Sequence, residues 1–97
     1  MKCIIYRRQV RQAVRIEKLA DIPNLKGVKM VGRYLHYDCD GNFISLQYAL
    51  YFVNSEKYTI DLPDEKDWEE FHEYLNAEFK AAGIKPALVS GTIQGLP

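Results

Sequence analysis

Several features that usually reveal a function or a compartment are scarce in this sequence. Its two cysteines, Cys3 and Cys39, have neither the CxxC spacing of a redox motif nor that of a zinc site. The longest strongly apolar run, residues 48–53, is far shorter than the roughly 20 residues that a membrane-spanning helix needs. The apolar stretch at residues 3–6 is too short for a signal peptide. A cytoplasmic protein with reduced thiols is therefore expected, with no membrane association.

Motifs of catalysis and of metal binding are also lacking. The chain has no Gly-rich phosphate loop, and none of its three serines lies in a Gly-x-Ser-x-Gly elbow. One group of ligand-type residues, His36, Asp38 and Asp40, precedes a turn, and turn chemistry accounts for both aspartates without a metal. The sequence therefore predicts a non-enzymatic protein with no catalytic, cofactor-binding or metal site.

Net charge is lacking too, because 13 basic residues balance 13 acidic ones. The two signs are nevertheless separated along the chain: residues 1–33 carry nine basic and two acidic side chains, whereas residues 64–97 carry three basic and seven acidic ones. Such asymmetry can mark a charged partner, or it can mean that the two halves of the chain attract each other within the fold. The sequence leaves both interpretations open.

Length and composition indicate one ordinary globular domain, residues 1–97. A chain of 97 residues fits a single domain and is long enough for one core. Apolar residues make up 47% and charged residues 27% of the chain, which is typical of folded proteins and excludes wholesale disorder.

A helix near the C-terminus is predicted from its apolar periodicity. Its side chains recur at steps of three and four in one stripe: Trp68, Phe71, His72, Leu75, Phe79 and Ala82. Asp64, or in competition Asp61, suits the N-cap. Gly83 suits the left-handed position after the last turn, and Pro86 prevents continuation. The helix should span about residues 65–82, with His72 as a core or boundary residue.

Three strands in a row precede this helix. The clearest covers residues 42–53, whose even positions, starting with Ile44, are all apolar and should face the core. An Asp-Gly-Asn turn at 40–42 joins it to a strand around 28–37, and a further strand follows at 57–62. The predicted fold class is α+β: an antiparallel β-meander of about 3–5 strands packed against one C-terminal amphipathic α-helix.

The two ends of the chain are less regular. Apolar residues alternate at even positions from 4 to 16, which favours two strand pieces, with a bulge or bend near Arg8–Gln9 and with Arg7, Arg11 and Arg15 on the outer face. A strand followed by a short helix remains an alternative. Residues 86–97 form either a frayed tail or a short edge strand.

The outer face of the C-terminal helix provides the first functional hypothesis. It carries several acids near its first turns, centred on Asp67, Glu69, Glu70 and Glu73. These acids can simply complement the helix dipole and aid solubility. They can also form a docking surface for a basic partner protein, as expected of a small regulator, inhibitor or adaptor.

The basic N-terminal segment provides the alternative hypothesis, single-stranded nucleic-acid binding. Its cations, with tyrosines on the sheet surface, would contact phosphates and stack on bases. The residues concerned are Arg7, Arg8, Arg11 and Arg15, together with Tyr34, Tyr37 or Tyr51. The arginines can instead pair with Glu17, with Asp61 and with the helix acids. An open sheet edge would also allow a homodimer.

Overall fold

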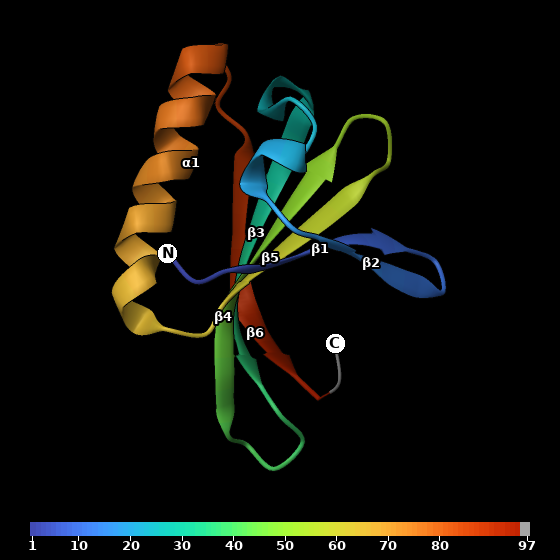
Figure 1. Ribbon diagram of the computed structural model, residues 1–97, viewed down its shortest axis with the longest axis vertical. Coiled ribbons are helices and arrows are strands. Elements are labelled where there is room, and N and C mark those ends of the chain that lie inside the picture. The colour runs from blue at the N-terminus through green and yellow to red at the C-terminus, as the bar shows by residue number, and fades with distance from the viewer. Residues whose placement is uncertain (96–97) are drawn as a thin grey trace.

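Within residues 1–95, which the computed structural model describes, six strands form one mixed sheet and one α-helix lies along a face of it (Figure 1). The strand order across the sheet is β2-β1-β5-β4-β3-β6. In chain order the elements are β1 (Ile4–Gln9), β2 (Gln12–Ile16), η1 (Leu19–Asp21), η2 (Leu25–Gly27), β3 (Val28–Tyr37), β4 (Phe43–Phe52), β5 (Lys57–Leu62), η3 (Glu65–Asp67), α1 (Trp68–Ala82) and β6 (Ala87–Gln94). The predicted α+β class is confirmed.

The predicted meander is only part of the sheet. Strands β3, β4 and β5 pair antiparallel in sequence, as expected. Strand β6 instead runs parallel to β3, from the pair Met30 and Ala87 to the pair Tyr37 and Gln94. Helix α1 is the reason, because it carries the chain from β5 past β4 and β3 to the far edge, and such a crossover returns the strand in the same direction. The sheet is therefore mixed rather than antiparallel.

The tail after Pro86 is an ordered edge strand rather than a frayed end. Strand β6 is eight residues long, which is longer than the short edge strand that the sequence predicts. The last two residues, Leu96 and Pro97, lie outside the described residues.

The N-terminal segment consists of two strand pieces, as expected, and the break between them is a chain reversal. A tight turn at Val10 and Arg11 reverses the chain, so that β1 and β2 form an antiparallel hairpin. The break expected near Arg8–Gln9 is a full chain reversal that begins at the next residue, and Arg8 and Gln9 themselves pair regularly with β2. The turn matters for function, because it decides which arginines share a face of the sheet.

The C-terminal helix is confirmed, including its ends. Together η3 and α1 span the predicted residues 65–82. The Asp64 carboxylate accepts a hydrogen bond of 3.2 Å from the backbone N–H of Lys66, which caps the first turn. Gly83 adopts the left-handed conformation with φ of 71° and ends the helix.

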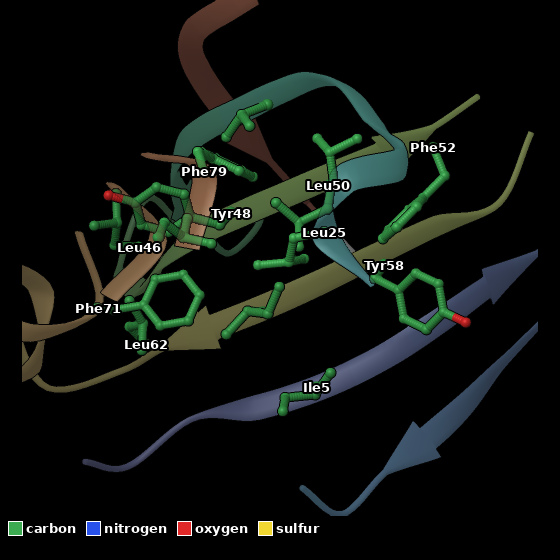
Figure 2. Packing of buried hydrophobic residues seen from close by; sticks show 14 residues of the cluster. Ile5, Leu25, Leu46, Tyr48, Leu50, Phe52, Tyr58, Leu62, Phe71 and Phe79 are labelled. Atoms are coloured by element: carbon green, nitrogen blue, oxygen red, sulfur yellow. The ribbon is translucent and has the colours of Figure 1, made fainter. Parts of the chain in front are cut away.

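The core lies between α1 and the sheet, and Figure 2 shows its packing. Its buried members come from every strand except β2 and β6, and from η2 and α1: Ile5, Leu25, Val28, Val31, Leu46, Tyr48, Leu50, Phe52, Tyr58, Ile60, Leu62, Phe71, Leu75 and Phe79. The even positions of β4 face this core from Leu46 onward. Ile44 does not and is 42% exposed, because a register irregularity brings Phe43 opposite Tyr37. The prediction for Ile44 is wrong for that reason.

Candidate functional site

The face of the sheet opposite α1, here called the open face, carries polar and aromatic side chains. The register of the strands shows which residues belong to the open face, because residues that alternate with core residues point away from the helix. They are Ile4, Tyr6, Arg8, Ala13, Arg15, Met30, Gly32, Tyr34, His36, Ser45, Gln47, Ala49, Tyr51, Lys57, Thr59, Asp61, Ala87, Val89, Gly91 and Ile93. Within the described part of the chain no helix covers this face.

Two arginines converge on one aromatic ring of the open face. The guanidinium carbons of Arg8 and Arg15 lie 5.0 Å and 5.9 Å from the centroid of the Tyr6 ring. Arg8 also donates to the Thr59 hydroxyl at 3.0 Å, and Arg15 donates to the backbone carbonyl of Ile5 at 3.3 Å. These contacts orient both guanidinium groups without neutralising them, and cation–π attraction adds to their fixed placement.

These arginines keep their charge available for a ligand. Among the described residues, the one ion pair within 4.0 Å joins Lys66 and Asp64, at 3.5 Å. The alternative that the arginines pair with Glu17, Asp61 or the helix acids is therefore not realised as close contacts. A cation held by neutral groups attracts a phosphate or a carboxylate more strongly than a cation already paired with an acid.

Tyrosines continue the surface toward β6. The Lys57 ammonium lies 5.1 Å from the centroid of the Tyr51 ring. A Cβ atom built on Gly91 would lie 3.4 Å from the Tyr34 ring, so this ring rests on the neighbouring strand in a space that glycine leaves free. Burial first, and a hydrogen bond with Tyr51 second, raise the pKa of Tyr34. Tyr34 and Tyr51 thus form a second aromatic patch beside the arginine pair.

A shallow hollow of about 730 Å³ opens on the same face. Its lining comes from β1, β3, β4, β5, β6 and two turns: Arg7, Arg8, Gln9, Val10, His36, Gln47, Ser55, Glu56, Lys57, Thr59 and Ile93. Three cations face one carboxylate in this lining, so the hollow is electropositive on balance. An anionic or strongly hydrogen-bonding ligand suits such a surface.

Several buried side chains of the open face, here called its floor, are polar. Gln47 is 5% exposed and donates to the Asp61 carboxylate at 2.7 Å, and Thr59 is 1% exposed. His36 is 2% exposed, and its Nε2 lies 3.0 Å from the carbonyl of Gly95; since a carbonyl only accepts, Nε2 donates. Its Nδ1, like the hydroxyl of the cross-strand neighbour Ser45, has no partner among the described residues. Buried polar atoms are normally paired, so two on one floor suggest a ligand or water as the partner.

The structure separates the four predicted arginines. Arg8 and Arg15 share the open face, contrary to the expectation that Arg15 would lie with Arg7 and Arg11. Arg7 pairs in register with core-facing Tyr58, although its side chain still lines the hollow. Arg11 is exposed in the hairpin turn.

Of the three predicted tyrosines, Tyr34 and Tyr51 lie on the open face and Tyr37 lies on the helix face. The Tyr37 ring packs edge-on against Phe43, with centroids 5.7 Å apart. Sequence reasoning missed Tyr6 and Lys57. Both have cationic or aromatic cross-strand neighbours, but such pairs become visible only when the register is known.

The acidic helix face is smaller than predicted. Asp67 is 6% exposed and accepts a hydrogen bond of 3.0 Å from the backbone N–H of Lys2, so it serves the fold and is withdrawn from the surface. Glu69, Glu70 and Glu73 are exposed along α1. Within the ranges that the structure describes, none of these three glutamates has a cation within 4.0 Å.

The His36, Asp38 and Asp40 group does not converge on one point. The Asp38 carboxylate accepts hydrogen bonds from the backbone N–H groups of Asp40 and Asn42, at 2.9 Å and 2.8 Å, and so closes the β3–β4 turn. The hydrogen bond from the Asn42 backbone contributes most to lowering the pKa of Asp38. His36, by contrast, faces Gly95 on the floor of the open face. Among residues 1–95, no group of three or more His, Cys, Asp or Glu side chains has the arrangement of a metal site.

The remaining observations concern cysteines, membrane spans and similarity. Cys3 and Cys39 are both free thiols, and burial is the main cause that raises the pKa of Cys3. In the described residues, no helix has both the length and the apolar character to cross a membrane. The chain matches no protein-family model, and comparison with curated proteins and with solved structures gives no significant match.

Proposed function

We propose that the open face binds single-stranded nucleic acid. The observation that carries this proposal is the arrangement of Arg8 and Arg15 around the Tyr6 ring, with no carboxylate partner within 4.0 Å. Guanidinium groups contact phosphates and also stack on bases, while tyrosine rings offer further stacking surface. Lys57 beside Tyr51 repeats the same pairing of a cation and a ring on the adjoining part of the sheet.

The geometry favours an extended ligand over a compact one. The two cation–ring pairs lie on different strand pairs, β1–β2 and β4–β5, and the hollow extends between them to β6. A single strand lying across the sheet would meet several cations along its backbone and several rings under its bases. Stacking supplies about 1–3 kcal/mol per base, and phosphate contacts supply a salt-dependent term.

A direct test measures the affinity of fluorescently labelled single-stranded oligonucleotides by anisotropy over a range of salt concentrations. Wild-type protein should bind at low salt and lose affinity steeply as salt is added. The double variant Arg8→Ala, Arg15→Ala removes two cations. Because each phosphate contact contributes about 0.7 to the salt slope for single strands, the slope should flatten by about 1.4.

Arg33 provides the matched control. It is an exposed arginine of the same sheet, but it pairs in register with core-facing Tyr48 and therefore lies on the helix face. Arg33→Ala should leave both affinity and salt slope unchanged. An equal loss in Arg33→Ala, or no measurable binding by wild-type protein at low salt, would refute the proposal.

Docking of a basic protein on α1 is the second candidate, and we keep it because Glu69, Glu70 and Glu73 are exposed without close cations. Like charges at positions i and i+4 cost a few tenths of a kcal/mol, which a basic partner would relieve. Reversal of all three glutamates to lysine should abolish salt-sensitive capture of protein from nuclease-treated host lysate. Reversal of Glu17, an exposed acid outside α1, should not. Undiminished capture by the triple variant would exclude this role.

A further inference from the structure

Strand β6 leaves one edge of the sheet open. It pairs with β3 on one side, and no other described strand pairs with its outer side. Its backbone N–H and C=O groups on that side are therefore free to extend the ladder. An eight-residue edge with free ladder groups is a template for another strand.

The two edges of this sheet differ in protection. At the opposite edge, β2 has only five residues and carries Arg15, and Arg11 lies in the turn that precedes it. Charged side chains and short length are the usual means of preventing edge pairing. Strand β6 has neither, because no charged residue follows Lys85 and the strand has eight residues. The β2 edge is therefore protected against pairing with another strand, whereas the β6 edge is not.

An apolar groove runs beside β6 on the helix side. It has a volume of about 420 Å³, and its apolar lining includes Val31, Leu75, Phe79, Ile84 and Leu88. Lys80 and Lys85 also line it, at its polar margin with His72 and Asn76. Leu88 pairs in register with core-facing Val31, so its side chain points to the helix side, yet it remains 62% exposed. The core of the domain is thus incomplete at this edge.

We propose that β6 pairs antiparallel with β6 of a second copy of this chain, about a twofold axis perpendicular to the sheet. An uncharged edge is complementary to itself, and an isologous contact closes the assembly as a dimer. The antiparallel direction follows from Lys85. In a parallel pair the two Lys85 side chains would lie together, whereas antiparallel pairing places them at opposite ends of the joined strands.

The groove supplies interface area that backbone pairing of the two β6 strands alone does not supply. Stable interfaces bury at least roughly 1,200 Å² in total, more than a ladder of eight-residue strands covers without side-chain contacts beside it. Exposed Leu88 and the neighbouring groove of each copy lie on the same side of the joined sheet, where apolar side chains of the second copy would cover them. This contact does not involve Arg8, Arg15 or Tyr6, so a variant that blocks β6 pairing leaves the arginine–tyrosine cluster of the open face intact.

The test combines light scattering after size exclusion with a charge-exchange pair of variants. Wild-type protein should show a concentration-dependent mass rising from 11.3 kDa toward twice that value. Ser90 lies at the middle of β6 and is exposed, so lysine there would face its own copy near the twofold axis. Ser90→Lys and Ser90→Asp should each weaken dimerisation at least about tenfold, and their mixture should restore a heterodimer.

Gln12→Lys is the control, because it adds the same charge to exposed β2 at the opposite edge and should leave the dimer intact. If the β6 variants fail to fold, amide hydrogen exchange of the wild-type protein tests dimerisation instead. The β6 amides should exchange more slowly at high protein concentration than at low protein concentration.

Three results would each overturn the proposal. The first is a wild-type protein that stays monomeric up to about 1 mM, the dissociation constant that corresponds to about −4.1 kcal/mol. The second is a dimer that survives Ser90→Lys or does not form in the mixture of the two variants. The third is a monomer whose β6 edge binds an added apolar peptide of unrelated sequence but not a peptide with the sequence of residues 86–94, which would assign the edge to a different peptide partner.

Discussion

Removal of the Phe71 ring should cost this domain a large part of its stability. Phe71 lies at the centre of the contact between α1 and the sheet and is 0% exposed. Its ring centroid lies 5.0 Å from that of Tyr48 on β4 and 5.8 Å from that of Tyr74 on its own helix. The variant Phe71→Ala therefore removes apolar burial and two ring contacts, and leaves a cavity beneath the helix.

The expected loss is about 3–5 kcal/mol, the range for a fully buried Phe→Ala substitution. The ring pairs account for about 0.5–1.5 kcal/mol of such losses beyond burial alone. A domain of this size has a free energy of unfolding of about 5–15 kcal/mol. The substitution should thus remove a third or more of the total in a domain of intermediate stability, while Phe71→Leu, which retains most of the side-chain volume, should lose less.

Urea unfolding followed by the fluorescence of Trp68 measures this loss. Trp68 is the one tryptophan of the chain, and it reports on the same interface, because its Nε1 donates to the Leu62 carbonyl at 3.1 Å and its ring lies 5.8 Å from that of Phe43. The denaturant slope should stay unchanged, so that the midpoint shift gives the stability difference. The exposed neighbour Glu70 is the control, and Glu70→Ala should change stability by no more than about 0.5 kcal/mol. A loss below about 1 kcal/mol for Phe71→Ala, at an unchanged slope, would refute the described packing of α1.

Two further predictions concern the tyrosines. A Cβ atom at Gly32 would lie 2.7 Å from the Tyr34 hydroxyl oxygen, so Gly32→Ala should displace the ring and cost about 1–3 kcal/mol in urea unfolding; an unchanged midpoint would contradict this. Burial is the first cause that raises the pKa of Tyr34, Tyr58 and Tyr74. The neutral tyrosines therefore contribute stability that is fully present below the unfolded pKa of about 10 and is lost as pH rises through the higher folded values, so Tm should fall between about pH 8 and about pH 11. A Tm that is constant or rises over that interval would show that these rings are not buried as described.

The sequence predicts α1 almost completely, because every determinant of this helix is local. Apolar periodicity identifies its inner stripe, the Asp64 side chain caps its start, and Gly83 supplies the left-handed residue at its end. Most of strand β4 is predicted for the same reason, since an Asp-Gly-Asn turn indicates its beginning and alternation gives its core face from Leu46 onward, although not at Ile44.

The open face could not be predicted, because it depends on where the first hairpin turns. The turn at Val10 and Arg11 contains no Gly, Pro, Asn or Asp, so nothing local indicates it. A shift of one residue in that turn would exchange which arginines lie with Tyr6. The burial of Asp67 was missed for a similar reason, since its partner, the backbone N–H of Lys2, lies 65 residues away.

Part of the separation of charge along the chain becomes a separation across the sheet, although Arg33 lies on the helix face and Asp61 on the open face. Arg8, Arg15 and Lys57 lie on the open face, whereas Glu69, Glu70 and Glu73 lie on the helix that covers the other face. Because the net charge is zero, attraction of a charged partner must depend on these local fields, which salt screens within about 8–10 Å. A twofold axis perpendicular to the sheet keeps the faces apart: both open faces would lie on one side of the proposed dimer and both helices on the other. Anion binding and basic-protein docking would then take place on opposite sides of the dimer, so that neither would block the other. Dimerisation would also double the number of phosphate contacts available to one extended strand.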